Sequence, residues 1–128
     1  MSRTKERLTV FKIVFSSLYQ DFLDYNEFAL FVKSEPILIS DDQMQLLTNL
    51  FQQKDFYIKK IQSLLKINWK WERLSKIEQA VLLVALSEAE TWKTEKAVII
   101  NESLVTIKKY GSDQHYKYIN AVLDRAIV

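Results

Sequence analysis

The sequence predicts an all-α fold, a bundle of six to seven helices, and three observations support this prediction. The 128 residues include one glycine and one proline, which leaves little of the turn chemistry that β-hairpins need. Apolar residues recur at spacings of three and four along most of the chain, which is the period of an amphipathic helix. Helix-start sequences precede several of these patterns. The length and the 48% of apolar residues fit one domain, residues 1–128.

The first third of the chain predicts two helices and a break. A long helix is expected over about residues 4–23, and a short helix or turn near residues 26–33. Pro36 then ends the pattern, because proline disfavours helical geometry in the residue before it. The apolar face of the first helix comprises Val10, Phe11, Ile13, Val14, Leu18 and Phe22. Its opposite side carries a polar stripe of basic character, formed by Lys5, Thr9, Lys12 and Ser16.

The next helix is expected to begin after Ser40, because Asp41 and Asp42 place negative charge where the helix dipole favours it. It extends, continuous or bent, to about Lys66. Its expected apolar face comprises Met44, Leu47, Phe51, Ile58, Ile61 and Leu65. A short helix or tight connection that carries two tryptophans follows over residues 67–74.

The central helix has the clearest local signals. Ser75 and Glu78 match a capping box, in which the hydroxyl and the carboxylate each satisfy an orphan backbone N–H. The run A-V-L-L-V-A-L behind them is apolar on almost every side, which is typical of the buried helix of a bundle. This helix should end near Thr91 or Trp92.

Two helices are expected after it. Thr94 is predicted to cap the first, and Gly111 suits a left-handed C-terminal stop. The pair Ser112-Asp113 is predicted to start the second. The buried face of the first comprises Ile99, Ile100, Leu104 and Ile107, and that of the second comprises Ile119, Val122, Leu123 and Ala126.

Composition argues against most catalytic chemistry. The chain has no cysteine and one histidine, so a structural zinc site lacks its usual ligands and a catalytic triad would have to use His115. A phosphate-cradling loop needs glycines that the chain lacks. We therefore expect no enzyme, metal or cofactor. No apolar run approaches the length of a membrane span and no signal peptide is recognisable, so a cytoplasmic protein without a membrane partner is expected.

Three stretches carry a family resemblance. The chain has an Ile-Asn-Glu that opens one helix, a Lys-Lys-Tyr-Gly that closes it, and Tyr-Ile-Asn-Ala-Val-Leu-Asp in the next helix. Earlier come R-L-S-K-I-E-Q-A-V-L-L-V-A-L-S-E and the N-terminal R-L-T-V-F-K-I-V-F. Together these resemble the NusB family. The sequence departs from the family pattern at Ala121, where glycine is usual, and at His115, where serine is common.

The resemblance implies a fold, a function and partners. The family fold consists of two small packed helical subdomains, which here correspond to residues 1–66 and 67–128. Family members are transcription antitermination factors that bind boxA, a short single-stranded RNA element of ribosomal RNA leader transcripts. They do so with the ribosomal protein NusE and join the RNA polymerase antitermination complex. The same RNA and protein partners are implied here, and a homodimer is left open.

Sequence-selective binding of single-stranded RNA uses cations for the phosphates and exposed aromatic rings for unstacked bases. The net charge is only +2, so a local patch has to supply the cations. The expected RNA-binding residues are Arg3, Lys5, Arg7, Lys12 and Phe15 in the first helix, and Lys117 and Tyr118 in the last. The alternatives are a solvated helix face for the cations, core packing for Phe15 and surface packing for Tyr118.

Two other function classes stay open. A protein-binding adaptor with the same fold and no RNA specificity is one, because the N-terminal basic cluster is thinner than in many family members. An accessory of a ribosomal RNA methyltransferase is the other. A NusB-like helical domain precedes the catalytic domain of ribosomal RNA cytosine methyltransferases, but this chain contains no methyltransferase motif.

Overall fold

The computed structural model describes residues 2–111 and 115–128, and within these residues it contains six α-helices and one short 3-10 helix. The N-terminal half contributes α1 (Arg3–Ser17), α2 (Tyr25–Ser34) and α3 (Asp41–Leu64). A 3-10 turn (Trp71–Arg73) precedes α4 (Lys76–Thr91), which is followed by α5 (Lys96–Tyr110) and α6 (Tyr116–Ala126). The described residues contain no strand, so they agree with the predicted all-α class.

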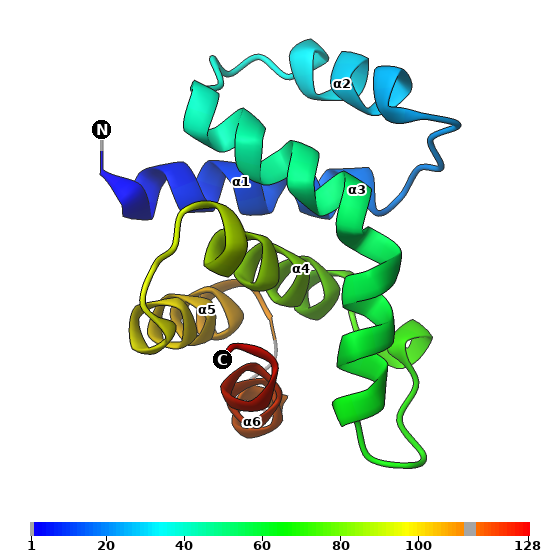
Figure 1. Cartoon of the computed structure of the whole chain (residues 1–128), viewed down its shortest axis with the longest axis vertical. Helices are drawn as coiled ribbons and strands as arrows, with labels where there is room; N and C mark the ends of the chain where they lie inside the picture. The colour runs from blue at the N-terminus through cyan, green and yellow to red at the C-terminus, as the bar shows by residue number, and fades with distance from the viewer. Residues whose placement is uncertain (1, 112–114) are drawn as a thin grey trace.

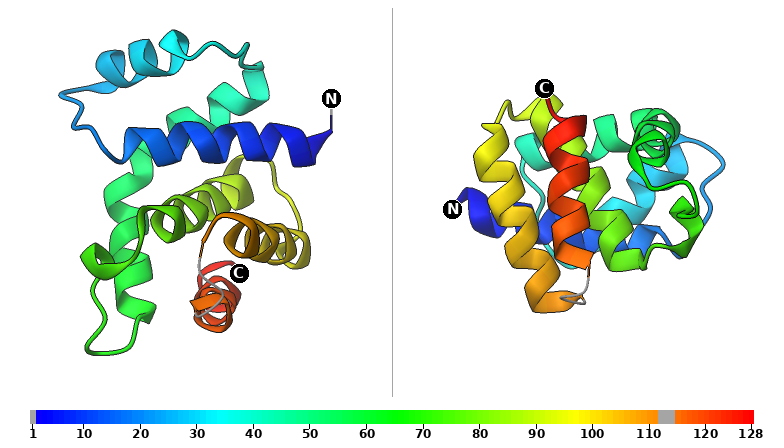
Figure 2. Two further views of the ribbon diagram at one scale, coloured as in Figure 1. Left: turned by 180° about the vertical axis from the view of Figure 1, so that it is seen from behind. Right: turned by 90° about the horizontal axis from the view of Figure 1, so that it is seen from below.

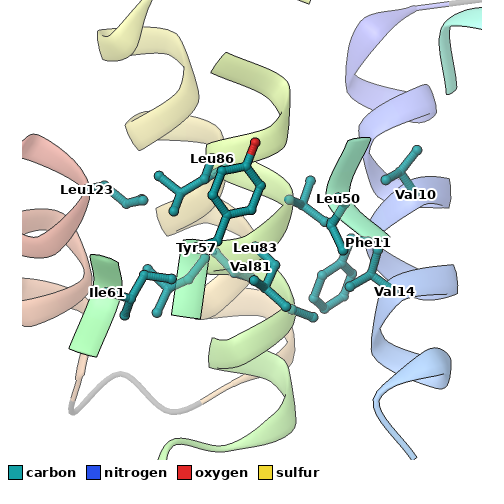
Figure 3. Close-up of a cluster of buried hydrophobic side chains, with 14 of the residues drawn as sticks. Val10, Phe11, Val14, Leu50, Tyr57, Ile61, Val81, Leu83, Leu86 and Leu123 are labelled. Carbon is teal, nitrogen blue, oxygen red and sulfur yellow. The ribbon is translucent and has the colours of Figure 1, made fainter. Parts of the chain in front are cut away.

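The bundle is organised around α4 (Figure 1), which contacts α1, α3, α5 and α6. Every residue from Glu78 to Glu88 is buried, as the apolar run predicted. The helices α1 and α3 cover one side of α4, whereas α5 and α6 cover the other (Figure 2). Side chains from α1, α3, α4 and α6 meet in the core, where Leu50, Tyr57 and Leu86 lie close together (Figure 3). The predicted division into subdomains 1–66 and 67–128 stays a prediction.

The first helix ends at Ser17, so the prediction that it extends to Leu23 was wrong. The backbone N–H of Leu18 caps the helix by donating to the carbonyl oxygens of Val14 and Phe15, and the chain then changes direction. The reason is tertiary. Phe22 packs among rings of α2 and α3, with its centroid 5.5 Å from that of Phe28, and these contacts stabilise a chain path that leaves α1 after Ser17.

The helix α3 is continuous and starts as predicted, with Ser40 and Gln43 forming a capping box. Its buried face is shifted from the expected one. Of the expected residues, Leu47 and Ile61 are buried, whereas Phe51 is half-buried beside α2. The residues that the pattern missed are Leu46, Leu50 and Tyr57, all buried. A helix that contacts α1, α2, α4 and α6 presents a wider apolar stripe than one three-and-four pattern describes.

Two predicted helix boundaries around α5 were wrong. The N-cap residue is Glu95, without a side-chain cap bond, and the chain reverses at Lys93, which has a φ of 55°. Gly111 is extended, with a φ of −115°, rather than left-handed. It is nevertheless tightly placed, since a Cβ there would lie 3.0 Å from the carbonyl oxygen of Ile107. The predicted start of the last helix at Ser112-Asp113 lies outside the described residues.

The buried faces of the last two helices follow the sequence pattern closely. In α6 the four expected residues Ile119, Val122, Leu123 and Ala126 are all buried. In α5 Ile99 and Ile107 are buried, whereas Ile100 and Leu104 are half-buried at its margin.

Candidate nucleic-acid interface

The first turn of α4 lies at the centre of the candidate interface. The Ser75 hydroxyl accepts a hydrogen bond from the Glu78 backbone N–H at 3.1 Å, and Glu78 Oε1 accepts one from the Ser75 N–H at 2.9 Å. The predicted capping box is therefore confirmed. It fixes the Glu78 carboxylate at the start of a helix, where the helix dipole favours negative charge.

The second oxygen of Glu78 ties α4 to the start of α6. Glu78 Oε2 lies 2.6 Å from Nδ1 of His115, the residue that precedes α6. Since the carboxylate accepts, the imidazole donates through its Nδ1–H. The His115 side chain is half-buried.

His115, Trp69 and Tyr118 form what we term the α6 aromatic cluster. The Trp69 ring lies edge-on to both others, with its centroid 5.0 Å from that of His115 and 4.2 Å from that of Tyr118. Beside the cluster is a pocket of about 480 Å³, lined by Lys66, Ile67, Asn68, Trp69 and Tyr118. Apolar and aromatic atoms with a lysine at the margin suit an unstacked base next to its phosphate.

The hydroxyl of Tyr118 is unusual. It is buried, and it has no hydrogen-bond partner among the described residues. Burial raises the pKa of Tyr118 above its ordinary value, and the negative charge of Glu78 adds a smaller increase. The ring is half-buried against Trp69, so it offers one face or edge to a ligand rather than a free platform.

A second set of rings, the α1–α5 aromatic row, consists of Phe11, Phe15, Tyr19 and Tyr110. The Phe15 centroid lies 6.3 Å from that of Phe11 and 5.4 Å from that of Tyr19, and the Phe11 centroid lies 5.7 Å from that of Tyr110. Phe15 is half-buried and Tyr19 is exposed. The row therefore offers a partly solvent-accessible aromatic edge.

The two aromatic groups flank the first turn of α4. Gly111 follows Tyr110 directly, and a Cβ there would lie 3.4 Å from Cγ2 of Ile77, beside Glu78. The row thus reaches α4 from the α1 side, and the α6 aromatic cluster reaches the same turn through His115. Phe15 and Tyr118, which are far apart in sequence, thus belong to two aromatic groups that are each connected to the first turn of α4.

The expected cations have different environments. Lys5 and Lys12 are exposed on the polar side of α1, and neither forms an ion pair within the described part of the chain. Lys117 is likewise exposed, on α6. These three are available to phosphates.

The two arginines are engaged within the protein. Arg3 pairs with Glu6 at 3.0 Å and Asp42 at 2.9 Å, and its guanidinium lies 4.0 Å from the ring centroid of Trp92. It is at the end of α1 that is remote from Phe15. Arg3 can still present part of its guanidinium, since its side chain remains 44% exposed.

Arg7 is buried rather than displayed. Its Nε and Nη2 donate to the two oxygens of Glu88, both at 2.6 Å, and the Glu88 side chain is 1% exposed. The hydrogen bonds to Glu88 raise the pKa of Arg7 above its ordinary value, against the lowering effect of burial. In this structure the guanidinium therefore neutralises a buried carboxylate and has no face for a phosphate.

Two cations that the sequence did not single out lie beside the rings. The Nζ of Lys109 is 5.3 Å from the centroid of Tyr110, and the Nζ of Lys108 is 4.9 Å from that of Tyr116. A Lys-Lys pair in the last turn of a helix is explained by the helix dipole alone, so its position gave no signal of binding.

The described residues contain no group of three or more histidine, cysteine, aspartate or glutamate side chains placed to hold a metal ion. None of the helices in this part of the chain combines the length and apolar character needed to cross a membrane.

Comparison with known proteins decides the family. The profile of the NusB family matches residues 4–127. The chain belongs to the NusB family. A curated relative, transcription antitermination protein NusB of Staphylococcus carnosus, is 34% identical over 125 residues, which cover 96% of this chain and 97% of the relative.

Solved structures of NusB proteins share the fold. A crystal form of NusB from T. maritima superposes with a TM-score of 0.83 at 23% identity, covering 99% of this chain and 91% of that one. The NusB-related chain in a structure of antitermination factors NusB and NusE with double-stranded RNA gives a TM-score of 0.74 at 20% identity. It covers 99% of this chain and 98% of that one. The all-α NusB architecture is thus established for this chain.

Proposed function

We propose that this NusB-family chain is a transcription antitermination factor that binds a boxA-like single-stranded RNA together with the ribosomal protein NusE. The single observation that carries the proposal is the family match, which extends over residues 4–127 and includes a full-length relative named for antitermination. The solved neighbour that contains NusB, NusE and RNA supports the choice of partners. We further propose that it acts in the cytoplasm within the RNA polymerase complex, by binding and not by catalysis.

For the RNA we propose a path across the first turn of α4. Lys12 on α1 and Lys117 on α6 are exposed cations that can contact phosphates along this path. Lys5 is also exposed, but it lies toward the end of α1 that is remote from Phe15, so it would contact the RNA beyond the path. Phe15 and Tyr118 supply ring edges on either side of the turn. The revised set adds Lys108 and Lys109 beside Tyr116 and Tyr110, and it assigns Arg7 to the interior.

The test is a titration of a boxA-like RNA and of a scrambled RNA of the same length, with and without NusE, at several salt concentrations. We expect the boxA-like RNA to bind at least about tenfold more tightly, because base contacts add to the shared phosphate term. Equal affinity of the two RNAs at the same salt would refute RNA selectivity. It would then favour the adaptor role, which also fits the pairing of Arg3 and Arg7 with carboxylates of the same chain.

Charge reversal provides the matched control. Lys12→Glu should weaken binding and lower the steepness of the salt dependence by about 0.7 for each phosphate that is no longer neutralised. Lys33→Glu changes an exposed lysine in α2, away from the proposed path, and should leave affinity nearly unchanged. If both reversals weakened binding equally, the RNA would be responding to net charge rather than to this surface.

A further inference from the structure

The helix α2 and its two flanking loops form the outer edge of the molecule, against α3 (Figures 1 and 2). The inner side of this segment is fully engaged. The Phe28 ring stacks on Phe51 of α3 with centroids 4.8 Å apart, and Phe22 lies edge-on to both. The Tyr25 hydroxyl lies 3.0 Å from that of Thr48 on α3. These contacts hold the segment in place without help from its outer side.

Four large apolar side chains of this segment are exposed rather than packed on α3, and we term them the α2 outer surface. Leu23 is 90% exposed, Leu30 is 68%, Ile37 is 49% and Leu38 is 93%. Leu23 precedes α2 and is fixed there, because its backbone N–H donates to Glu27 Oε1 at 2.9 Å. Leu30 lies mid-helix, and the other two follow the helix. Four exposed aliphatic side chains within 16 consecutive residues mark this segment as a candidate interaction site.

The charge of the same segment is opposite to that of the rest of the chain. Residues 20–42 contain six carboxylates and one lysine, a formal charge of −5, whereas the whole chain carries +2, so the remainder carries +7. The carboxylates are Asp21, Asp24, Glu27, Glu35, Asp41 and Asp42. Asp42 pairs with Arg3 and Asp24 caps α2, but Asp21, Glu27 and Asp41 are exposed around the apolar residues.

The negative charge of this segment indicates which kind of molecule can bind to the α2 outer surface. Nucleic acid is repelled by it, since phosphates and carboxylates carry the same sign. Two copies of the chain that met through this surface would bring two segments of −5 together, which disfavours a symmetric dimer. A partner that carries both basic and apolar side chains is favoured, because its basic groups can pair with the carboxylates and its apolar groups can cover the exposed aliphatic side chains.

We propose that the α2 outer surface is a docking site for a basic, amphipathic segment of a partner protein. The partner's apolar side chains would cover Leu30 and its neighbours, and its lysine or arginine residues would face the surrounding carboxylates. The surface is separated from the first turn of α4 by α1 and α3 (Figure 1), so this partner and the proposed RNA can bind together. The inference is independent of the proposed RNA function.

The experiment uses the intact chain and a synthetic helical peptide of about 18 residues, with leucine at spacings of three and four and lysine elsewhere. Amide chemical shifts should change within residues 20–42. The double variant Leu30→Ser, Leu38→Ser should bind about tenfold more weakly, because two apolar side chains no longer pack against the peptide. Val105→Ser, a change at an exposed valine of α5, should bind like the unaltered chain.

Three results would overturn the proposal. Shift changes that fall outside residues 20–42 would place the peptide elsewhere. Equal binding of a peptide with glutamate in place of lysine would show that charge plays no part. Concentration-dependent self-association that Leu30→Ser, Leu38→Ser abolishes would identify a second copy as the occupant. Both substitutions are at exposed side chains, so the fold should survive them and circular dichroism should confirm it.

Discussion

The buried pair of Arg7 and Glu88 allows a prediction that separates a structural cation from an RNA-binding one. Both hydrogen bonds measure 2.6 Å, and the carboxylate is 1% exposed. In Arg7→Ala the charge of Glu88 would stay buried without its partner. Breaking a buried pair in this way costs about 3–5 kcal/mol of the free energy of unfolding. The loss of two charge-assisted hydrogen bonds, at about 1.5–3 kcal/mol each, would cost about 3–6 kcal/mol, which overlaps that range.

The companion variant Arg7→Met, Glu88→Leu removes both charges and keeps apolar volume. Replacement of a buried ion pair by well-packed apolar side chains is often neutral or stabilising, so we expect a free energy of unfolding within about 1 kcal/mol of the original. Glu102 lies 3.6 Å from Arg7 Nη1 and is 24% exposed, so water can solvate it once the arginine is gone. Urea unfolding followed by tryptophan fluorescence measures all three proteins.

The same double variant tests the assignment of Arg7. If the guanidinium is purely internal, the variant should bind the boxA-like RNA as tightly as the unaltered chain, whereas Lys12→Glu should bind it more weakly. The reasoning fails if Arg7→Ala costs less than about 1 kcal/mol, or if the double variant is as unstable as the single one. A loss of RNA affinity in a stably folded double variant would show that Arg7 contacts phosphate.

Other substitutions give sharp outcomes. Tyr118→Phe should raise the free energy of unfolding by about 1 kcal/mol because its buried hydroxyl has no partner among the described residues. Tyr57→Phe should lower it by a similar amount, since that hydroxyl accepts from an asparagine at 2.7 Å; thermal unfolding compares the two. Burial raises the pKa of both tyrosines, so the folded state keeps protons that the unfolded state releases. Stability should therefore fall as the pH rises above about 10, in step with tyrosinate absorbance. Gly111→Ala should cost about 1 kcal/mol in urea unfolding, because its Cβ would meet the backbone oxygen of Ile107. His115→Asn, whose amide N–H can replace Nδ1–H, should retain RNA affinity that His115→Ala loses; equal affinities would exclude a positioning role for this hydrogen bond.

What the sequence predicted well rests on signals that are local and mutually consistent. The capping box of Ser75 and Glu78 and the apolar run behind it specify both the start and the burial of α4. In α6 the three-and-four spacing identified all four buried residues. Each of these features depends on side chains within one or two turns of a helix, and a single sequence contains that information.

What the sequence missed depends on contacts between remote residues. Arg7 and Glu88 are 81 positions apart, and nothing near Arg7 in the chain distinguishes it from its exposed neighbour Lys5. The end of α1 is set by the rings that receive Phe22, which belong to α2 and α3. The face of α3 is shifted because four helices pack on it. In each case a tertiary contact overrides a pattern that local spacing alone leaves ambiguous.

The Glu78 side chain belongs both to the helix cap of α4 and to the candidate interface. The sequence predicted its role in the helix cap, and the structure adds a contact to the start of α6. The two oxygens of Glu78 have different partners: Oε1 accepts from the Ser75 N–H, and Oε2 accepts from His115. The cap already restricts the Glu78 side chain. The hydrogen bond to His115 therefore orders His115 and the rings beside it without a further loss of conformational entropy at Glu78. Through this hydrogen bond the central helix α4 fixes the position of the α6 aromatic cluster, which is proposed to contact the RNA.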